Sequence, residues 1–245
     1  MKHLILVILL IPSILFSQDH RFQIDYNEGS IKKTFLIENN KLFKISGTIE
    51  EIYIFSSNSI AKEYLTNLDQ SLKPRIKYRI GKTTLFVDSA ESISYYSINT
   101  PSGSIGQIKS INNITFTYLS KASFNQNAGV VGELSKIGNI KVNYYTDLAK
   151  GKHRGKIKYL GNKKFNYQPW STWGEKAGIV GELTSIGNMK INYYDTDYAI
   201  GFKGKLKSIG NVKFTYFLDK AENRIAGIVG KFKQQAGKDS RLIIR

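Results

Sequence analysis

Residues 204–216 read GKLKSIGNVKFTY, and five copies of this phrase, the quoted one included, fill the second half of the chain. The other four read GQIKSINNITFTY from Gly106, GELSKIGNIKVNYY from Gly132, GKIKYLGNKKFNY from Gly155 and GELTSIGNMKINYY from Gly181. A sixth, degenerate copy, GKFKQQAGKDSRLI, begins at Gly230. The starting glycines are alternately 26 and 23 residues apart, so the repeating unit is a pair of copies 49 residues long. A period in this range predicts a repeat architecture.

Each copy has the pattern of a β-hairpin. In the copy from Gly204, alternating stretches at 205–209 and 212–217 flank Gly210-Asn211. A glycine followed by Asn suits a two-residue type II′ turn, because the first turn residue needs a positive φ. In the earliest copy Asn112 takes the place of this glycine, and Asn tolerates positive φ better than most residues. Such a short turn fixes the register, with Ile209 opposite Val212.

The predicted register divides each hairpin into a core face and an outer face. We expect the core face to carry Ile209, Val212, Phe214 and Tyr216, with the stems of Lys205 and Lys207 lying along the aromatic rings. We expect the outer face to carry Leu206, Ser208, Lys213 and Thr215.

The chain as a whole is expected to be all-β, an antiparallel meander of repeated hairpins in an open or rolled sheet. Residues 102–245 form the repeat region, with the degenerate copy as a carboxy-terminal cap. Residues 18–101 form a β-rich region with hairpins at 22–37 and 75–88. One short helix is predicted at 59–68, capped by Asn58 or Ser59, and is expected to cover an edge of the sheet.

The repeat resembles a known class of exported sequences. Its frame of Tyr-Tyr-Asp, best kept at Tyr194-Asp195, followed by Gly-Lys-Leu and a hairpin turn, resembles the tyrosine–aspartate (YD) repeats of secreted RHS-type proteins. It is also similar to the Gly-x-Leu-x-x-Ile-Gly-Asn hairpin repeats of exported proteins of Bacteroidota. The resemblance covers residues 103–230 and implies a β-hairpin array, with no functional residues carried over.

The first residues predict export. Lys2 precedes an apolar run at 4–11, which ends at Pro12 and leads to the small residue Ser17, so 1–17 is predicted to be a signal peptide. This run is too short to span a bilayer, and no transmembrane helix is expected elsewhere. The predicted location is the periplasm, the outer-membrane surface or the extracellular space. With 0 Cys, the exported chain must fold without disulfides.

The net charge of +17 favours anionic partners. We expect an anionic component of the cell envelope or a protein partner, and no nucleic acid. An alternative explanation of the charge is solvation of strand positions that face water. The oligomeric state is not predicted.

The candidate binding residues lie in the loops between hairpins. Trp170 and Trp173 follow Pro169, and Trp side chains there either pack over the end of a sheet or form flat surfaces for sugar rings. The basic residues that would form an anion-binding rim are Lys150, Lys152, Arg154 and Lys176.

The residue sets of common catalytic and metal sites are missing. Without Cys and with only 3 His, thiol catalysis and Cys- or His-based metal sites are not expected, and no cofactor is predicted. Glu133 and Glu182 are a possible carboxylate pair, but they occupy the same place in two copies, which indicates a structural role. Asp195 and Asp197 are expected to form a turn rather than a calcium site.

Three hypotheses of function follow, in decreasing order of preference. The first is a non-enzymatic exported β-repeat scaffold or binding protein of the cell envelope that contacts an anionic glycan or glycolipid. The second is a small outer-membrane β-barrel. The third is a glycoside hydrolase that uses two carboxylates.

Overall fold

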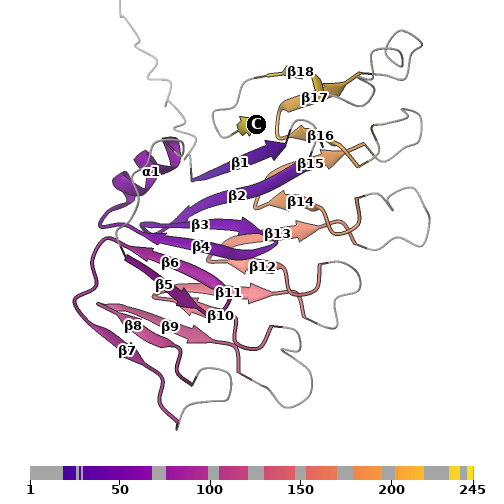
Figure 1. The fold of residues 1–245 in the computed structure, drawn as a ribbon. Helices are drawn as coiled ribbons and strands as arrows, with labels where there is room; N and C mark the ends of the chain where they lie inside the picture. The colour runs from indigo at the N-terminus through magenta and orange to yellow at the C-terminus, as the bar shows by residue number, and fades with distance from the viewer. Residues whose placement is uncertain are drawn as a thin grey trace, which may run out of the picture.

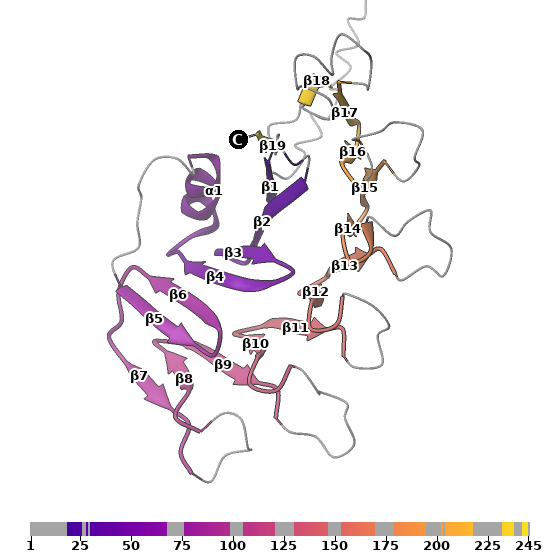
Figure 2. The ribbon, with the colours of Figure 1, turned by 45° about the vertical axis from the view of Figure 1, so that its right-hand side comes forward.

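The computed structural model describes residues 19–25, 28, 30–67, 76–98, 105–120, 130–146, 153–169, 179–194, 202, 204–217, 232–237 and 242–244. These residues form two sheets and one helix, which confirms the all-β class (Figure 1). The two sheets face each other across one hydrophobic cluster, and the helix lies on the far side of the smaller sheet (Figure 2). The predicted signal peptide, 1–17, lies outside the described residues.

The larger sheet is the predicted antiparallel meander. Its twelve strands follow in chain order from β7 at one edge to β18 at the other. They are β7 (Ile93–Tyr95), β8 (Ile108–Ile111), β9 (Ile114–Tyr118), β10 (Leu134–Ile137), β11 (Ile140–Tyr144), β12 (Ile157–Leu160), β13 (Lys163–Tyr167), β14 (Leu183–Ile186), β15 (Met189–Tyr193), β16 (Leu206–Ile209), β17 (Val212–Tyr216) and β18 (Phe232–Ala236).

The hairpin turns are those that the sequence predicts. Ile209 pairs with Val212 across Gly210-Asn211. Gly210 has a φ of +53°, and Asn112, in the same place of the earliest copy, has a φ of +51°. Positive φ at the first turn residue and not at the second agrees with a type II′ turn.

The predicted division into faces is wrong at the first strand of each hairpin. Tyr193 pairs with Leu206 and Asn192 with Ser208, so Lys207 is an extra residue, a β-bulge. The bulge shifts the alternation by one residue, which buries Leu206 and turns Lys207 to solvent. Lys205, just before the strand, is half-buried with its ammonium 5.3 Å from the centre of the Tyr216 ring. An equivalent bulge occurs wherever two hairpins meet. The bulge residues, which have no cross-strand partner in the pairing register, are Lys109, Ser135, Lys158, Thr184, Lys207 and Lys233.

The smaller sheet has the strand order β19-β1-β2-β3-β4-β6-β5. Its strands are β1 (His20–Asp25), β2 (Ser30–Glu38), β3 (Lys41–Ser46), β4 (Thr48–Ile54), β5 (Ile76–Ile80), β6 (Thr83–Val87) and β19 (Leu242–Ile244). The predicted hairpins β1–β2 and β5–β6 are present. Two pairs, β1 with β19 and β4 with β6, are parallel, which the prediction of an antiparallel meander did not include.

The two regions of the sequence exchange strands. β7 lies before residue 102 yet forms the edge of the larger sheet, and β19 lies at the end of the repeat region yet pairs with β1. The degenerate copy therefore spans both sheets, with β18 in one and β19 in the other.

Helix α1 (Asn58–Thr66) covers a face of the smaller sheet rather than an edge. Ser57, not the predicted Asn58 or Ser59, is its cap, and the Ser57 hydroxyl accepts a hydrogen bond from the backbone N–H of Ile60. Ala61 and Leu65 are the buried helical residues. They pack on a second cluster formed by Phe35, Ile37, Leu42 and Phe55.

Hairpin tips of the smaller sheet contact the starts of the repeat copies. The carbonyl of Gly47, between β3 and β4, accepts a hydrogen bond of 2.8 Å from the backbone N–H of Ile157. Lys82, at the β5–β6 turn, forms an ion pair with Glu133. Lys205 donates to the carbonyl of Glu28, which lies between β1 and β2. These contacts hold the sheets in one relative position.

Candidate anion-binding face

Most of the predicted loop site lies outside the described residues. This applies to Trp170, Trp173, Lys150, Lys152 and Lys176, and also to Asp195 and Asp197. Arg154 is described and is exposed in the turn before β12.

The two repeated glutamates face the smaller sheet. Glu133 is 8% exposed, and its carboxylate lies 2.9 Å from Nζ of Lys82. Glu182 is half-buried and lines a cavity between the sheets. Burial and, to a lesser extent, the negative charges of Glu133 and Glu182 raise the pKa of Tyr144 and Tyr193 respectively. Each glutamate therefore neighbours the tyrosine of its own hairpin.

The cavity between the sheets has a volume of about 200 Å³. Its polar lining includes Lys32, Thr34, Lys156 and Glu182. Lys156 already donates to the carbonyl of Gly181, and its ammonium lies 5.0 Å from the centre of the Tyr167 ring. Lys156 thus makes its contacts within the repeat sheet, on the side that faces the smaller sheet.

The opposite face of the repeat sheet carries rows of lysines. The first row lies on the return strands of four successive hairpins, and all its members are exposed: Lys141, Lys164, Lys190 and Lys213. Their cross-strand partners beside each turn are Lys136, Tyr159, Ser185 and Ser208. Cross-strand partners share one face, so these side chains lie on the side away from the hydrophobic core.

The bulges provide a second row. Lys109, Lys158 and Lys207 occupy equivalent bulge positions 49 residues apart and are all exposed. The ammonium of Lys158 lies 5.7 Å from the centre of the Tyr145 ring, and that of Lys207 lies 5.6 Å from the centre of Tyr194. An aromatic ring face favours a cation, so these tyrosines hold the two lysines in place.

Hydroxyl and amide groups lie on the same face as the lysines and bond to one another between hairpins. Asn166 donates to the Ser185 hydroxyl at 2.7 Å, and Asn192 donates to the Ser208 hydroxyl at 2.9 Å. This part of the outer face is neutral and does not compensate the lysine charge.

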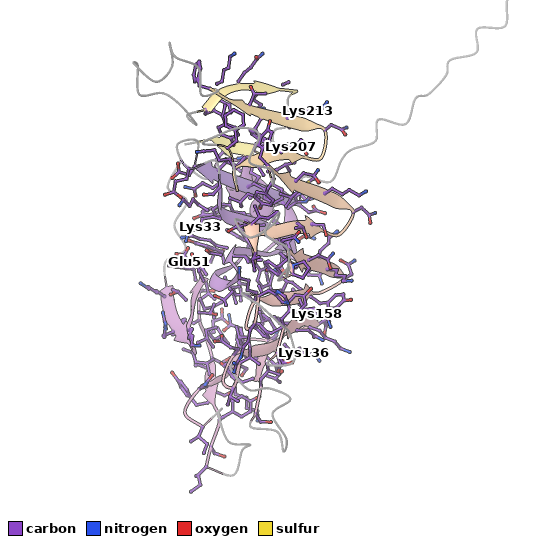
Figure 3. All side chains as sticks on the ribbon, turned by 90° about the vertical axis from the view of Figure 1, so that its right-hand side faces the viewer. Lys33, Glu51, Lys136, Lys158, Lys207 and Lys213 are labelled. Carbon is purple, nitrogen blue, oxygen red and sulfur yellow. The ribbon has the colours of Figure 1, made fainter. Side chains whose placement is uncertain are left out.

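Among the described residues, no carboxylate forms an ion pair with a lysine of the two rows. The strand sequences from β8 to β18 contain no Asp or Glu. The ion pairs found within the described residues take their lysine from the amino-terminal region instead: Lys32–Glu28, Lys33–Glu50, Lys44–Glu51, Lys62–Asp19 and Lys82–Glu133. In Figure 3, Lys213, Lys207, Lys158 and Lys136 follow one another along the repeat sheet, whereas Lys33 and Glu51 belong to the smaller sheet.

In the smaller sheet, by contrast, lysines lie beside carboxylates that balance their charge. Burial by itself would raise the pKa of Glu51, but hydrogen bonds from Lys44 and Tyr53 and the charges of Lys44 and Lys33 lower it. Lys44 lies 2.8 Å from the Glu51 carboxylate. The repeat strands offer their lysines no equivalent acidic partner.

Within the described residues, no group of three or more His, Asp or Glu side chains is arranged to hold a metal ion. No helix in that part of the chain is both long and apolar enough to cross a membrane. A scan against models of protein families and searches of curated proteins and of solved structures found no match to this chain.

The sequence contains a signal for the lysine face in the spacing of its apolar residues. Lys213 was predicted on the outer face, and the structure confirms it, but Lys207 was placed on the core face. In a strand whose side chains alternate strictly, two residues three positions apart lie on opposite faces. Leu206 and Ile209 are three positions apart and both apolar, so strict alternation would leave one of them outside the core. This spacing, repeated in other copies, was the available sign of a bulge.

Proposed function

We propose that the protein is a non-enzymatic scaffold of the cell envelope whose outer repeat-sheet face, defined by Lys136, Lys141, Lys158, Lys164, Lys190, Lys207 and Lys213, binds an anionic carbohydrate. The ligand is an acidic glycan chain or the headgroup region of an acidic glycolipid. The observation that carries the proposal is that these lysines are exposed and form no ion pair with any residue that the structure describes. The signal-like residues 1–17 support an exported location.

The spacing of the lysines favours an extended ligand with repeating charges. Neighbouring strands are about 4.8 Å apart, so lysines on alternate strands are about 10 Å apart. A flat row of equivalent charges fits a linear chain better than a single small anion, because each repeat can contact one segment of the chain. The serine, threonine and asparagine side chains on the same face suit sugar hydroxyls as hydrogen-bonding partners.

The carboxylates support a non-enzymatic role. Glu133 is engaged by Lys82 on the side of the sheet that faces the core, and Glu182 lies in the cavity between the sheets. Neither glutamate belongs to the outer face where the lysines lie.

The test is a calorimetric titration of the protein with an acidic polysaccharide and with a neutral polysaccharide of similar length. We expect binding to the acidic chain alone, with an affinity that falls as salt is raised, because the contacts are solvent-exposed charges. The variant K164Q/K213Q should bind at least about fivefold more weakly at low salt, since each exposed ion pair contributes roughly 0.5 kcal/mol.

The matched control is K62Q/K77Q, which removes the same charge from exposed positions in α1 and β5. It should bind as the unaltered protein does. Equal losses in the two variants would mean that net charge alone attracts the polymer, and the proposed face would be wrong. Tighter binding of duplex DNA than of the acidic glycan at equal salt would replace the carbohydrate by a nucleic acid.

A further inference from the structure

The first strand of the repeat sheet is half of a hairpin. Residues 93–96, Ile-Ser-Tyr-Tyr, precede 142–145, Val-Asn-Tyr-Tyr, by one double repeat. β7 pairs with β8 in the register by which β11 pairs with β12, including the bulge. The hydroxyl of Tyr96 donates to the carbonyl of Phe116 at 2.8 Å, as that of Tyr145 donates to Phe165 at 3.0 Å. β7 is thus a return strand that has no first strand beside it within the described residues.

The last strand of the sheet is the complementary half. β18 pairs with β17 as β16 pairs with β15, with Phe232 in the place of Leu206. In the register of the other copies the return strand would span 238–242, and Leu242, the residue of this span that the structure describes, pairs with Phe22 of β1 in the other sheet. β18 is thus a first strand that has no return strand beside it within the described residues.

We propose that the chain associates head to tail with a second copy of itself, β18 of one copy pairing antiparallel with β7 of the next. The hairpin register then predicts Gln234 opposite Ser92 and Gln235 opposite Glu91 of the second copy, in the places of Ser208–Lys213 and Ile209–Val212. The backbone N–H of Glu91 donates to the side-chain oxygen of Asn112 in the single chain, and pairing with Gln235 replaces this hydrogen bond. The pair completes a hairpin that neither end can form alone.

The exposure of Tyr95 is consistent with a strand of another copy beside β7. It is 57% exposed, whereas its equivalents Tyr144 and Tyr193 are 7% and 6% exposed. Tyr144 belongs to the core cluster between the sheets, and its hydroxyl donates to the carbonyl of Leu134 in the neighbouring strand at 2.9 Å. The equivalent acceptor for Tyr95 is the carbonyl of Phe232 in a neighbouring copy.

Further exposed apolar side chains lie close to β7 in the sequence. Ile98 is 79% exposed and Ile105 is 57% exposed. Together with Tyr95 they are three of the five large hydrophobic residues exposed in the described part of the chain. Large apolar side chains gathered at one exposed place are typical of an interaction site.

At each end of the sheet one strand residue, Ile93 in β7 and Gln235 in β18, turns its backbone groups away from the neighbouring strand. The carbonyl of Ser92 accepts a hydrogen bond from Asn112 of the β8–β9 turn, so the backbone groups of the next residue, Ile93, face the free edge. The carbonyl of Gln234, the cross-strand partner of Thr215, accepts a hydrogen bond from the Thr215 hydroxyl of β17, so the backbone groups of Gln235 face away from β17. An open edge of this kind pairs readily with another strand.

The charges at the two ends are also complementary. Asp88 and Glu91 are exposed just before β7, and Lys233 is exposed on β18. Opposite charges of this kind select the end-to-end contact over contacts between two like ends. Because the two surfaces differ, the contact is heterologous and produces open chains rather than closed dimers. The inference does not depend on the proposed ligand.

The experiment is sedimentation velocity of the full chain over a wide range of concentrations. We expect species that grow with concentration from the 27.7 kDa monomer to its multiples. Y95K places a charge on the β7 end, and Q235P removes the backbone N–H that faces the free edge of β18. Each variant alone should remain monomeric, and a mixture of the two should form dimers and nothing larger, because only one pair of intact ends is left.

The control variant Q235A keeps the backbone N–H and should associate as the unaltered protein does. Circular dichroism and thermal unfolding of each variant at low concentration establish that it is folded. A monomer at all concentrations would overturn the inference, as would association of Y95K or Q235P alone, or a mixture that stays monomeric.

Discussion

His153 lies in one double repeat where Phe202 lies in the next. Both rings are buried, and each meets a tyrosine edge to face, with centres 4.9 Å apart for His153 and Tyr145 and 5.3 Å apart for Phe202 and Tyr194. Nδ1 of His153 is buried without a hydrogen-bond partner among the described residues. Burial and, second, the charge of Lys156 lower the pKa of His153, so the folded protein holds this ring neutral.

The first prediction is that stability falls in mild acid through His153. An unfolded histidine titrates near pH 6.5, and the folded one titrates below that value. As pH falls through about 6.5, the unfolded chain binds a proton that the folded chain does not, so the free energy of unfolding decreases. H153F should raise this free energy, and the gain should be larger at about pH 5.5 than at about pH 7.5, as measured by urea denaturation.

The control for this prediction is H20F, which replaces a half-buried histidine in β1 of the other sheet. It should leave most of the pH dependence in place. If H153F loses stability with falling pH as steeply as the unaltered protein, another group is responsible.

The hairpins of the repeat sheet were predictable because their determinants are local. Gly210-Asn211 sets both the turn and the register, and the equivalent turn at Asn112 keeps the positive φ without glycine. The bulge at Lys207 was not predicted, because it depends on how two neighbouring hairpins fit together. This error placed Lys207 on the core face, so only part of the lysine face was evident from the sequence.

The pairing of distant segments also does not follow from local sequence patterns. β19 joins β1, and β4 joins β6, in parallel pairs whose partners are set by packing rather than by turns. The residues 93–96 were not recognised as a repeat, because the preceding glycine and first strand of that copy are absent. The 49-residue spacing of its tyrosine pair to Tyr144-Tyr145 was the signal that could have revealed it.

The second prediction concerns the close contact of the two sheets at Gly81. Its φ is +57°, and a Cβ atom there would lie 2.9 Å from the carbonyl oxygen of Gly132. G81A should therefore lower the free energy of unfolding for two reasons. A positive φ at alanine costs about 1 to 2 kcal/mol. Displacing the backbone that the new Cβ atom would contact costs roughly 1 kcal/mol or more in addition. Gly187 is the matched control, since its φ is +55° and nothing lies within 4 Å of the added atom.

Urea denaturation of G81A and G187A separates the two costs. Equal losses of stability would show that the contact between Gly81 and Gly132 is not tight. A larger loss in G81A is the expected result.

The third prediction concerns the tyrosines that close each hairpin. The hydroxyl of Tyr144 donates to the carbonyl of Leu134, ten residues earlier in the chain. The equivalent hydrogen bond joins Tyr118 to Ile108 and Tyr216 to Leu206. Y144F leaves a buried carbonyl without this donor, so it should lower the free energy of unfolding by about 1 kcal/mol or somewhat more. Y95F, at a concentration where the chain is monomeric, should change it by less than about 0.5 kcal/mol, since Tyr95 is mostly exposed. A loss in Y144F no larger than in Y95F would remove the hydrogen bond as a source of stability.

The fourth prediction concerns the ion pair between Lys82 and Glu133, whose two members differ in exposure. The side chain of Lys82 is 77% exposed and that of Glu133 is 8% exposed. K82Q leaves a buried carboxylate without its counter-charge, whereas E133Q leaves an ammonium that water solvates well. Chemical denaturation should therefore show a larger loss of stability for K82Q than for E133Q, and the double variant should resemble E133Q. The difference between the single variants should shrink at high salt, because the lysine side of the pair is open to screening. A larger loss in E133Q would contradict the prediction, because it would mean that the Glu133 carboxylate stabilises the fold by more than its pairing with Lys82.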